Sequence, residues 1–318
     1  MTSQHEVQTR LRHVFGDRVR ACVSLADFTT FRTGGPADWL LETHRVEDVV
    51  YAVRLTRELG LPLTLLGGGS NVLVGDDGVR GLVLRLRHGG VAISGPNRVR
   101  ADAGVTINGL VRWLIQRGLS GLEAWAGTPG TVGGAVYGNA HFDGRRLGDT
   151  VTTVQLVSRD GATTEVSRSA MGFGYDESRI QQTGELVLSA EFQVGEHDRA
   201  ALRAAACASL DYRKRTQPLG HASAGCIFQN PRPDDGWLPD DVPRSAGALI
   251  DRAGLKGRRV GGAIVSSVHG NFIVNEGGAT ARHIRRLIDD CRLTVVERFG
   301  VVLRDEVVCV GSLDDGGK

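Results

Sequence analysis

The feature that most constrains this chain is a short apolar run that leads into glycines and then into a second apolar run. Residues 63–66 are typical of a strand, residues 67–71 read GGGSN, and residues 72–74 are apolar again. A Rossmann dinucleotide fold needs its glycines to open a helix, so that the pyrophosphate meets the helix N-terminus. Because these glycines lead into a strand, the sequence excludes that fold. What remains is either an ordinary tight turn or a nest of backbone N–H groups that holds an anion.

A second glycine-rich segment strengthens the case for a bound anion. Residues 127–135 (GTPGTVGGA) follow the amphipathic pattern of 105–117, which predicts a helix. Glycine or alanine occupies five of these positions, which is too many for one tight turn, and Pro129 fixes the entry into the segment. Two such segments in one part of the chain suit an extended cofactor that carries its own pyrophosphate.

Periodicity along the rest of the chain predicts a mixture of helices and strands. Apolar residues at helical spacing predict helices at 46–58, 105–117, 200–215 and 280–299. Short apolar runs predict strands at 63–66, 72–74, 81–86, 151–157, 163–166, 186–194, 263–265, 272–274 and 301–310. The apolar face of the last helix is Ile284, Leu287, Ile288, Cys291, Val295 and Phe299. The chain is therefore expected to be an α+β protein, with a boundary between lobes near Gln217-Pro218.

Composition narrows the class of partner. A formal net charge of +2 over 318 residues predicts no bulk attraction to nucleic acid or to a membrane surface. The five cysteines form no CxxC pair and no histidine stands at metal-ligand spacing, which indicates a reducing compartment and no metal site. The N-terminus lacks the apolar segment of a signal peptide, and nowhere do about 18 apolar residues run together. We therefore expect a soluble, cytoplasmic protein, and nothing in the composition indicates an obligate protein partner.

Seven motifs, in order and in register, are similar to one enzyme family. They are TFRTGGPA at 30–37, GGGSN at 67–71, GTPGTVGGAVYGNA at 127–140, RKRTQPL at 213–219, SAGCIFQNP at 223–231, SAGALIDRAG at 245–254 and HGNFIVN at 269–275. The chain closely resembles the UDP-N-acetylenolpyruvoylglucosamine reductases over nearly its whole length. No counterpart of the tyrosine loop of longer members lies between Tyr175 and Leu186, so the resemblance is to the shorter subtype.

The resemblance implies an α+β fold with a FAD-binding lobe of the vanillyl-alcohol-oxidase/PCMH type, in two subdomains, and a smaller α+β substrate lobe. Residues 1–80 with the C-terminal strand 301–318 would form the first FAD-binding subdomain, 81–205 the second, and 206–300 the substrate-binding lobe. It further implies FAD as cofactor and NADPH as reductant. The residues that it implies around the flavin and its pyrophosphate are Gly67, Gly68, Gly69, Ser70, Asn71, Gly127, Thr128, Pro129, Gly130, Thr131, Gly133, Gly134, Ala135 and Asn139.

The family's reaction takes two half-steps. NADPH reduces the flavin and leaves, and the enolpyruvyl ether of UDP-N-acetylglucosamine takes its place. One alkene carbon then receives hydride from the flavin and the other receives a proton from a protein acid. Such a site needs an acid, a group that holds the substrate carboxylate and an electrostatic partner.

The resemblance assigns the acid to Cys226 and the catalytic carboxylate to Glu306. A thiol with its ordinary pKa of about 8.5 is largely protonated at neutral pH and can donate. The residues leave other interpretations open, namely a small buried apolar side chain for Cys226 and a solvated strand-edge charge for Glu306. Asn230 would contact the UDP-sugar and Arg213 the substrate or a phosphate, and both residue types equally suit a helix cap or the surface.

One position departs from the family pattern. Members carry an arginine after the tyrosine of GYR-x-S, where it holds the substrate carboxylate, whereas GYDES at 174–178 puts Asp176 beside Tyr175. In one explanation Arg179 reaches the site instead, although three residues on in an extended segment its side chain points to the opposite face. In the other two, the substrate lacks that carboxylate, or the chain binds flavin without this reaction. His141, after Asn139-Ala140, is a second departure.

The sequence therefore predicts a FAD-dependent reductase that forms the peptidoglycan precursor UDP-N-acetylmuramate. One alternative is a related FAD oxidoreductase that acts on another nucleotide-linked or amino-acid-derived substrate. The other is a flavin-binding protein without catalysis. The expected substrate contacts are Arg213, Asn230, Tyr175, Asp176 and Arg179.

Overall fold

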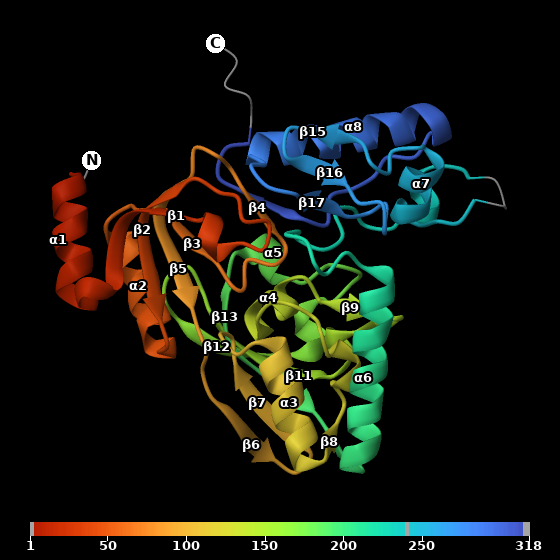
Figure 1. Cartoon of the computed structure of the whole chain (residues 1–318). Coiled ribbons are helices and arrows are strands. Elements are labelled where there is room, and N and C mark those ends of the chain that lie inside the picture. The colour runs from red at the N-terminus through yellow and green to blue at the C-terminus, as the bar shows by residue number, and fades with distance from the viewer. Residues whose placement is uncertain (1–2, 239–241, 314–318) are drawn as a thin grey trace. The chain divides into compact units, whose positions relative to one another are not determined.

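The computed structural model describes residues 3–238 and 242–313 of the chain (Figure 1). The chain forms two compact units, which are described one at a time. Unit 1 comprises Met1–Val23, Asp38–Gly68 and Arg80–Tyr212, and unit 2 comprises Ser24–Ala37, Gly69–Val79 and Arg213–Lys318. The predicted division into 1–80 with 301–318, 81–205 and 206–300 stays a prediction, and its residues 1–2, 239–241 and 314–318 lie outside the described residues.

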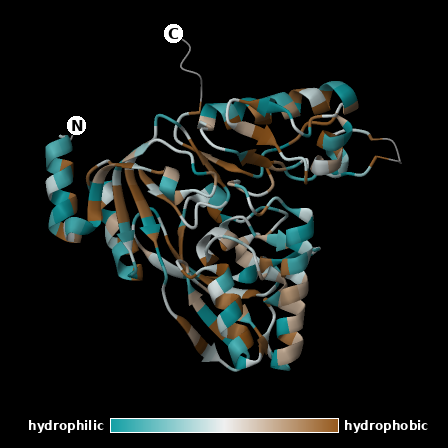
Figure 2. Ribbon diagram, in the orientation of Figure 1, coloured by the Kyte–Doolittle hydropathy of each residue, from teal (hydrophilic) through white to brown (hydrophobic). Residues whose placement is uncertain are grey.

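The first sheet, which lies almost wholly in unit 1, has the strand order β1-β2-β5-β3. Its elements are β1 (Val19–Ser24), β2 (Pro36–Thr43), β3 (Leu63–Leu65) and β5 (Val79–Leu86), with the helices α1 (Gln4–Phe15) and α2 (Val46–Glu58) beside it in the chain. α1 buries Val7, Leu11 and Phe15, which recur every four residues and so lie on one face. Figure 2 shows the other faces of α1 as mainly hydrophilic.

The second sheet of unit 1 is antiparallel, with the strand order β12-β11-β13-β7-β6. The central strand β13 is buried along most of its length, and α4 packs against it. The strands are β6 (Val91–Gly95), β7 (Arg98–Asp102), β11 (Val151–Val157), β12 (Thr163–Ser167) and β13 (Leu186–Gln193), with the short pairs β8 (Leu119–Ser120) and β14 (Gly195–Glu196), and β9 (His141–Phe142) and β10 (Arg145–Arg146). The helices are α3 (Ile107–Arg117), α4 (Val132–Tyr137), α5 (Ile180–Thr183) and α6 (Arg199–Thr216), the last of which ends in unit 2.

Unit 2 combines a three-stranded antiparallel sheet, β15-β16-β17, with a parallel strand pair, β4 and β18. Its elements are β4 (Val72–Val74), β15 (Arg259–Val260), β16 (Ala263–Val265), β17 (Ile273–Asn275), β18 (Val308–Val310), α7 (Ala246–Arg252) and α8 (Ala281–Phe299). The carboxylate of Asp76 accepts the backbone N–H groups of Ala281 and Arg282 at 2.7 and 3.0 Å. A residue about 200 positions away in the chain therefore caps the first turn of α8.

The predicted α+β class is confirmed, and most predicted elements lie within two residues of their observed bounds. The buried face of α8 is also as predicted, with Phe299 partly buried beside it. The prediction of a strand over 301–310 is wrong for its first part, since only Val308–Val310 forms a strand. Residues 301–307 are not paired in a regular ladder, because their backbone bonds go to 227–229 and to Asp235 at single positions.

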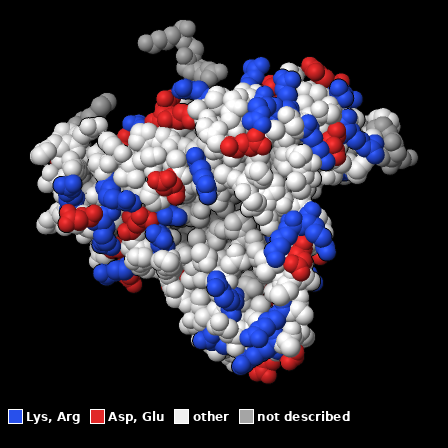
Figure 3. Space-filling view, viewed as in Figure 1, with Lys and Arg blue, Asp and Glu red and all other residues white. Residues whose placement is uncertain are grey.

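In the view of Figure 3, acidic and basic side chains lie close to one another over α8 and near α1. Within residues 3–238 and 242–313, no helix combines the length and the apolar composition that a membrane span requires.

Candidate active site

The glycines of the two predicted loops are required by a close approach of backbones in unit 1. A Cβ atom added at Gly68 would lie 2.6 Å from the Cα of Gly130, and one added at Gly67 would lie 2.8 Å from Oγ1 of Thr131. Both distances are shorter than any normal contact of a carbon atom. Gly127 and Gly130 also adopt positive φ angles of 83° and 101°, which glycine tolerates best. The sequence motif is therefore explained by loop-to-loop packing.

The second loop is anchored to its surroundings by its own backbone. The N–H groups of Val132 and Gly133 donate to the carbonyls of Val105 and Ala103 at 2.8 and 2.9 Å, and the carbonyl of Gly130 accepts from Ile107 at 3.1 Å. These bonds fix the loop relative to α3 and β7. If a substitution pushes the two loops apart, the first loop, at Gly67 and Gly68, is therefore the one that moves.

The first loop has backbone donors without acceptors. Among the hydrogen bonds of residues 3–238 and 242–313, none uses the N–H group of any residue from 67 to 71, whereas the carbonyls of Gly67, Gly69 and Asn71 accept from Arg85, Thr30 and Val308. A tight turn closed by its own hydrogen bond would use one of these donors. The segment instead has the property of an anion-binding nest, and with the glycine contacts it fits a cofactor that carries a pyrophosphate.

In unit 2, the segments that carry Cys226 and Glu306 lie side by side. The N–H of Glu306 donates to the carbonyl of Ile227 at 2.8 Å, and the N–H of Gln229 donates to the carbonyl of Arg304 at 2.9 Å. Phe228 and Asp305 form an antiparallel bridge between these bonds. The fold thus brings the two predicted catalytic residues, 80 positions apart in the sequence, onto adjacent segments.

Asn271 holds the segment of Cys226 from its other edge. Its side-chain Oδ1 accepts the N–H of Phe228 at 2.9 Å, and its Nδ2 donates to the carbonyl of Phe228 at 2.7 Å. The backbone carbonyl of Asn271 accepts the N–H of Ile227 at 2.9 Å. Asn271 is buried, and both Oδ1 and Nδ2 of its side chain are hydrogen-bonded, so the side chain fixes the backbone next to Cys226.

Arg213 provides a cation near the thiol of Cys226. Burial lowers the pKa of the Arg213 guanidinium to about 10, and its electrostatic interaction with Cys226 works in the opposite direction. The guanidinium is still charged at neutral pH. The half-buried Cys226 therefore lies within the electrostatic reach of a positive charge, which favours the thiolate that remains after the thiol gives up its proton.

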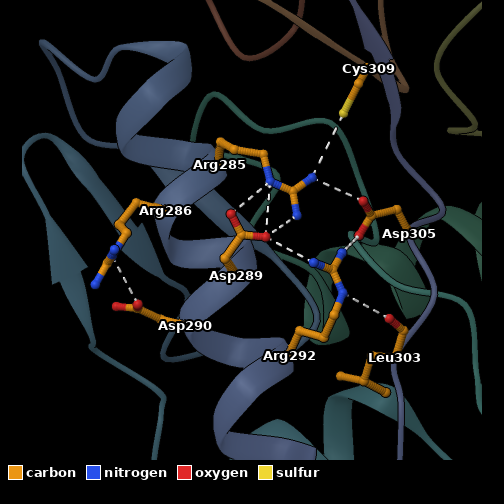
Figure 4. Close-up of polar contacts among 8 residues, drawn as sticks. All are labelled: Arg285, Arg286, Asp289, Asp290, Arg292, Leu303, Asp305 and Cys309. Atoms are coloured by element: carbon orange, nitrogen blue, oxygen red, sulfur yellow. Dashed lines mark hydrogen bonds and ion pairs between the residues drawn. The ribbon is translucent and has the colours of Figure 1, made fainter. Parts of the chain in front are cut away.

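The segment of Glu306 is held by side chains on both sides. Nδ2 of Asn71 donates to the carbonyl of Glu306 at 3.0 Å. Figure 4 shows Asp305 between two arginines of α8: Nη1 of Arg285 lies 3.0 Å from Asp305 Oδ2, and Nη2 of Arg292 donates to Oδ1. Burial lowers the pKa of the Arg285 guanidinium, but its hydrogen bonds to Asp289 and Asp305 outweigh burial and raise that pKa overall. Arg285 therefore stays charged.

Asn230 and Asn139 use their side chains within the protein. Oδ1 of Asn230 accepts the N–H of Ala246 at 3.0 Å, at the start of α7, which is the cap role that the sequence left open. Nδ2 of Asn139 donates to the carbonyl of Gly174 at 2.6 Å, and its Oδ1 accepts the N–H of Gly148 at 2.8 Å. Asn139, expected beside the cofactor, is buried and holds the 174–178 segment in place.

The segment after Tyr175 is not extended, which corrects the assumption made for Arg179. The N–H of Gly174 donates to the carbonyl of Glu177 at 3.0 Å, so residues 174–177 form a turn, and Arg179 stands at the start of α5. Nε and Nη2 of Arg179 each lie 3.0 Å from a carboxylate oxygen of Glu185. This two-point ion pair commits Arg179 to Glu185, so the explanation in which Arg179 replaces the missing arginine loses its support.

The two departures from the family pattern contact one another. Nδ1 of His141 lies 2.9 Å from Oδ1 of Asp176, and the His141 ring lies 4.7 Å from the ring of Tyr175. The Asp176 side chain is 9% exposed, whereas that of His141 is 28% exposed. The acidic side chain is therefore turned inward and covered, and the imidazole is the group that unit 1 presents there.

Sequence reasoning missed several of these residues. Asn271 lies inside the HGNFIVN motif, so its place in the motif was the available signal. Arg285 and Asp289 stand at i and i+4 on a predicted helix, which indicates an ion pair but not its contact with Asp305. The pairing of His141 with Asp176 joins residues 35 positions apart, and neither residue signals the other.

Comparisons with known proteins show the family of the chain. A model of the UDP-N-acetylenolpyruvoylglucosamine reductase C-terminal domain matches residues 217–310, and a model of a FAD binding domain matches residues 37–167. The chain is 41% identical over 302 residues to UDP-N-acetylenolpyruvoylglucosamine reductase 2 of Symbiobacterium thermophilum, with 94% of each chain covered. It is 39% identical over 291 residues to the reductase of Bacillus velezensis, with 91% of this chain and 92% of the relative covered.

A solved structure is also similar over most of its length. The crystal structure of UDP-N-acetylenolpyruvylglucosamine reductase (MurB) from Thermus caldophilus superposes with a TM-score of 0.77 and 35% sequence identity, covering 92% of this chain and 99% of that one. The predicted architecture, a FAD-binding lobe followed by a further α+β lobe, is confirmed by these matches.

Proposed function

The chain belongs to the UDP-N-acetylenolpyruvoylglucosamine reductase family, and from this premise we propose that it uses NADPH and FAD to reduce UDP-N-acetylglucosamine enolpyruvate to UDP-N-acetylmuramate. The structural observation that carries the proposal is the antiparallel pairing that puts Cys226 and Glu306 on adjacent segments. This arrangement favours the reductase over a flavin-binding protein without catalysis, which has no need to bring the segments of these two residues together. NADPH and the nucleotide sugar are cytoplasmic metabolites, so a cytoplasmic location is part of the proposal.

The residues that would hold FAD are those of the two loops. Gly67 and Gly68 face Gly130 and Thr131 at distances that only glycine permits, and the unused N–H groups of 67–71 suit the pyrophosphate. Bound FAD supplies the hydride for the substrate double bond and regains it from NADPH. The 127–134 loop, which the first loop packs against, is fixed by its own backbone bonds.

We assign the proton to the thiol of Cys226. One alkene carbon of the enolpyruvyl group gains a hydride, and the other gains the proton from Sγ, which leaves a thiolate. The nearby Arg213 guanidinium stabilises that thiolate until water restores its proton. No other reactant is needed, so the step balances.

We assign Glu306 the electrostatic role beside this acid. When protonated, its carboxyl group donates a hydrogen bond to the enolate oxygen that develops as the hydride arrives. Asn71 fixes the Glu306 peptide, and Arg285 and Arg292 fix the adjacent Asp305, so these three residues act as positioning residues. The positions of Tyr175, Asp176 and Asn230 around the UDP-sugar remain part of the proposal.

The role of Cys226 is tested by separating the two half-reactions in anaerobic stopped-flow measurements. In Cys226→Ala, reduction of the holoenzyme by NADPH is expected at the wild-type rate, whereas reoxidation by the enolpyruvyl substrate is slowed about 100-fold or more. Cys226→Ser, which keeps a proton on the side chain, is expected to retain more of the second rate. Cys207→Ala, at an exposed cysteine of α6, is the matched control. Full reoxidation by Cys226→Ala would remove this residue from the acid role.

A further inference from the structure

The contact between His141 and Asp176 has the structure of a functional pair. Nδ1 of His141 lies 2.9 Å from Oδ1 of Asp176, and this close contact restricts the orientation of the ring. Since the two nitrogens of imidazole lie on opposite sides of the ring, Nε2 is directed away from Asp176. With 28% of the His141 side chain exposed and 9% of the Asp176 side chain, a ligand on this surface meets the imidazole first.

The backbone conformation and the burial of Asp176 are both unfavourable for the stability of the fold. Its backbone φ is 56°, a conformation that is unfavourable for a residue with a side chain. Its Oδ2 is buried and, within the described residues, has no hydrogen-bond partner. A buried carboxylate is stable only when its surroundings compensate it, and His141 is the side chain that lies against it.

The pair is attached firmly to the loop that we assign to the flavin. Nδ2 of Asn139 donates to the carbonyl of Gly174, and Oγ of Ser178 donates to the carbonyl of Tyr137 at 2.6 Å. Nε2 of Gln181 donates to the carbonyls of Tyr137 and Asp176, both at 2.9 Å. These bonds tie the 174–178 turn to the end of α4, which begins in the 127–135 segment. All of them lie within unit 1.

We propose that His141 and Asp176 act as one unit that recognises the carboxylate of the substrate. Asp176 orients the ring through Nδ1, and Nε2–H of the imidazolium donates a charge-assisted hydrogen bond to the carboxylate. The negative charge of Asp176 is thus screened from the substrate by His141. Arg179 is already paired with Glu185, so it does not compete for this role. The inference rests on the proposed function, since it takes the enolpyruvyl carboxylate as the ligand.

A ratio of two affinities tests the proposal without turnover. The oxidised holoenzyme is titrated with UDP-N-acetylglucosamine enolpyruvate and, separately, with UDP-N-acetylglucosamine, which lacks the carboxylate, and the change in flavin absorbance gives each Kd. We expect the wild type to bind the enolpyruvyl ligand more tightly. In His141→Gln, this preference should fall by about 10- to 100-fold, the value of one charge-assisted hydrogen bond, while the Kd of UDP-N-acetylglucosamine is unchanged.

A second variant keeps the test decisive. Asp176→Asn preserves the shape of the side chain and removes its charge, and the preference should fall here as well. Because the two residues act as one unit, the double variant His141→Gln/Asp176→Asn should lose little more than either single variant.

Three results with the variants would overturn the inference: an unchanged preference in folded, flavin-loaded His141→Gln, an equal loss of affinity for both ligands, or fully additive losses in the double variant. The proposed function fails separately, if the NADPH-reduced wild type is not reoxidised by the enolpyruvyl ligand. A wild type that is reoxidised but shows no preference for the carboxylate would overturn the pair's role alone.

Discussion

Replacing Gly68 by alanine should weaken FAD binding without unfolding the chain. The added Cβ would lie 2.6 Å from the Cα of Gly130, with the carbonyl carbon and nitrogen of Gly130 at 3.3 and 3.4 Å. Carbon atoms normally approach to about 3.5–4.0 Å, so the two loops must separate by about 1 Å. Since backbone bonds of Val132 and Gly133 hold the second loop, the first loop is the one that moves.

The size of the effect follows from the donors that this shift displaces. A backbone N–H that moves by about 1 Å from its acceptor no longer makes a hydrogen bond, and a bond to a charged acceptor contributes about 1.5–3 kcal/mol. One lost bond to the pyrophosphate therefore weakens FAD binding by about 10- to 100-fold.

Quenching of FAD fluorescence on titration into apoprotein gives the Kd, and circular dichroism checks the fold. Gly95→Ala is the matched control, since its Cβ would have no atom within 4 Å. A folded Gly68→Ala variant with the wild-type Kd for FAD would refute the assignment of this loop to the cofactor.

Three further predictions concern positioning and stability. Asp305→Asn removes the carboxylate held by two arginines beside Glu306, so reoxidation by the substrate should slow by about 10- to 100-fold while reduction by NADPH is unchanged, and equal rates of reoxidation would contradict the positioning role. Asp76→Ala leaves two N–H groups of α8 uncapped and should lower the free energy of unfolding, measured in urea, by about 1–2 kcal/mol. The control Asp77→Ala removes an exposed ion pair with Arg282 and should lower the free energy of unfolding by less than about 1 kcal/mol. Burial raises the pKa of Asp48, but hydrogen bonds from Arg18 and Thr43 outweigh burial and lower the pKa overall. The carboxylate therefore stabilises the fold above about pH 4, and this stabilisation is lost as the pH falls. The Tm difference between wild type and Asp48→Asn should shrink on acidification, and a Tm difference that stays constant would contradict this role of Asp48.

The local elements of this fold could be predicted because their signals are local. The apolar stripe of α8 follows from the helical period of 3.6 residues, which the sequence displays directly, and β11 coincides with a short run rich in apolar residues. The extended course of 301–307 could not be predicted in the same way. Its apolar residues Val301, Leu303 and Val307 alternate as in a strand, but they are buried in the core of unit 2 without a continuous partner strand.

The candidate site shows the same division between local and distant information. Motifs identified Cys226 and Glu306, yet only the fold shows that residues 227–229 and 304–306 pair by backbone hydrogen bonds. The sequence placed an acid at position 176 and gave no sign that His141 covers it. A charge reversal judged from the sequence alone therefore leaves out the imidazole, which is the more exposed of the two side chains.

The most direct test of the proposed function is a pair of anaerobic additions to the wild-type holoenzyme. NADPH should bleach the flavin absorbance, and UDP-N-acetylglucosamine enolpyruvate should then restore it promptly with formation of UDP-N-acetylmuramate. A flavin that NADPH reduces but the enolpyruvyl ether leaves bleached would contradict the proposed reductase activity.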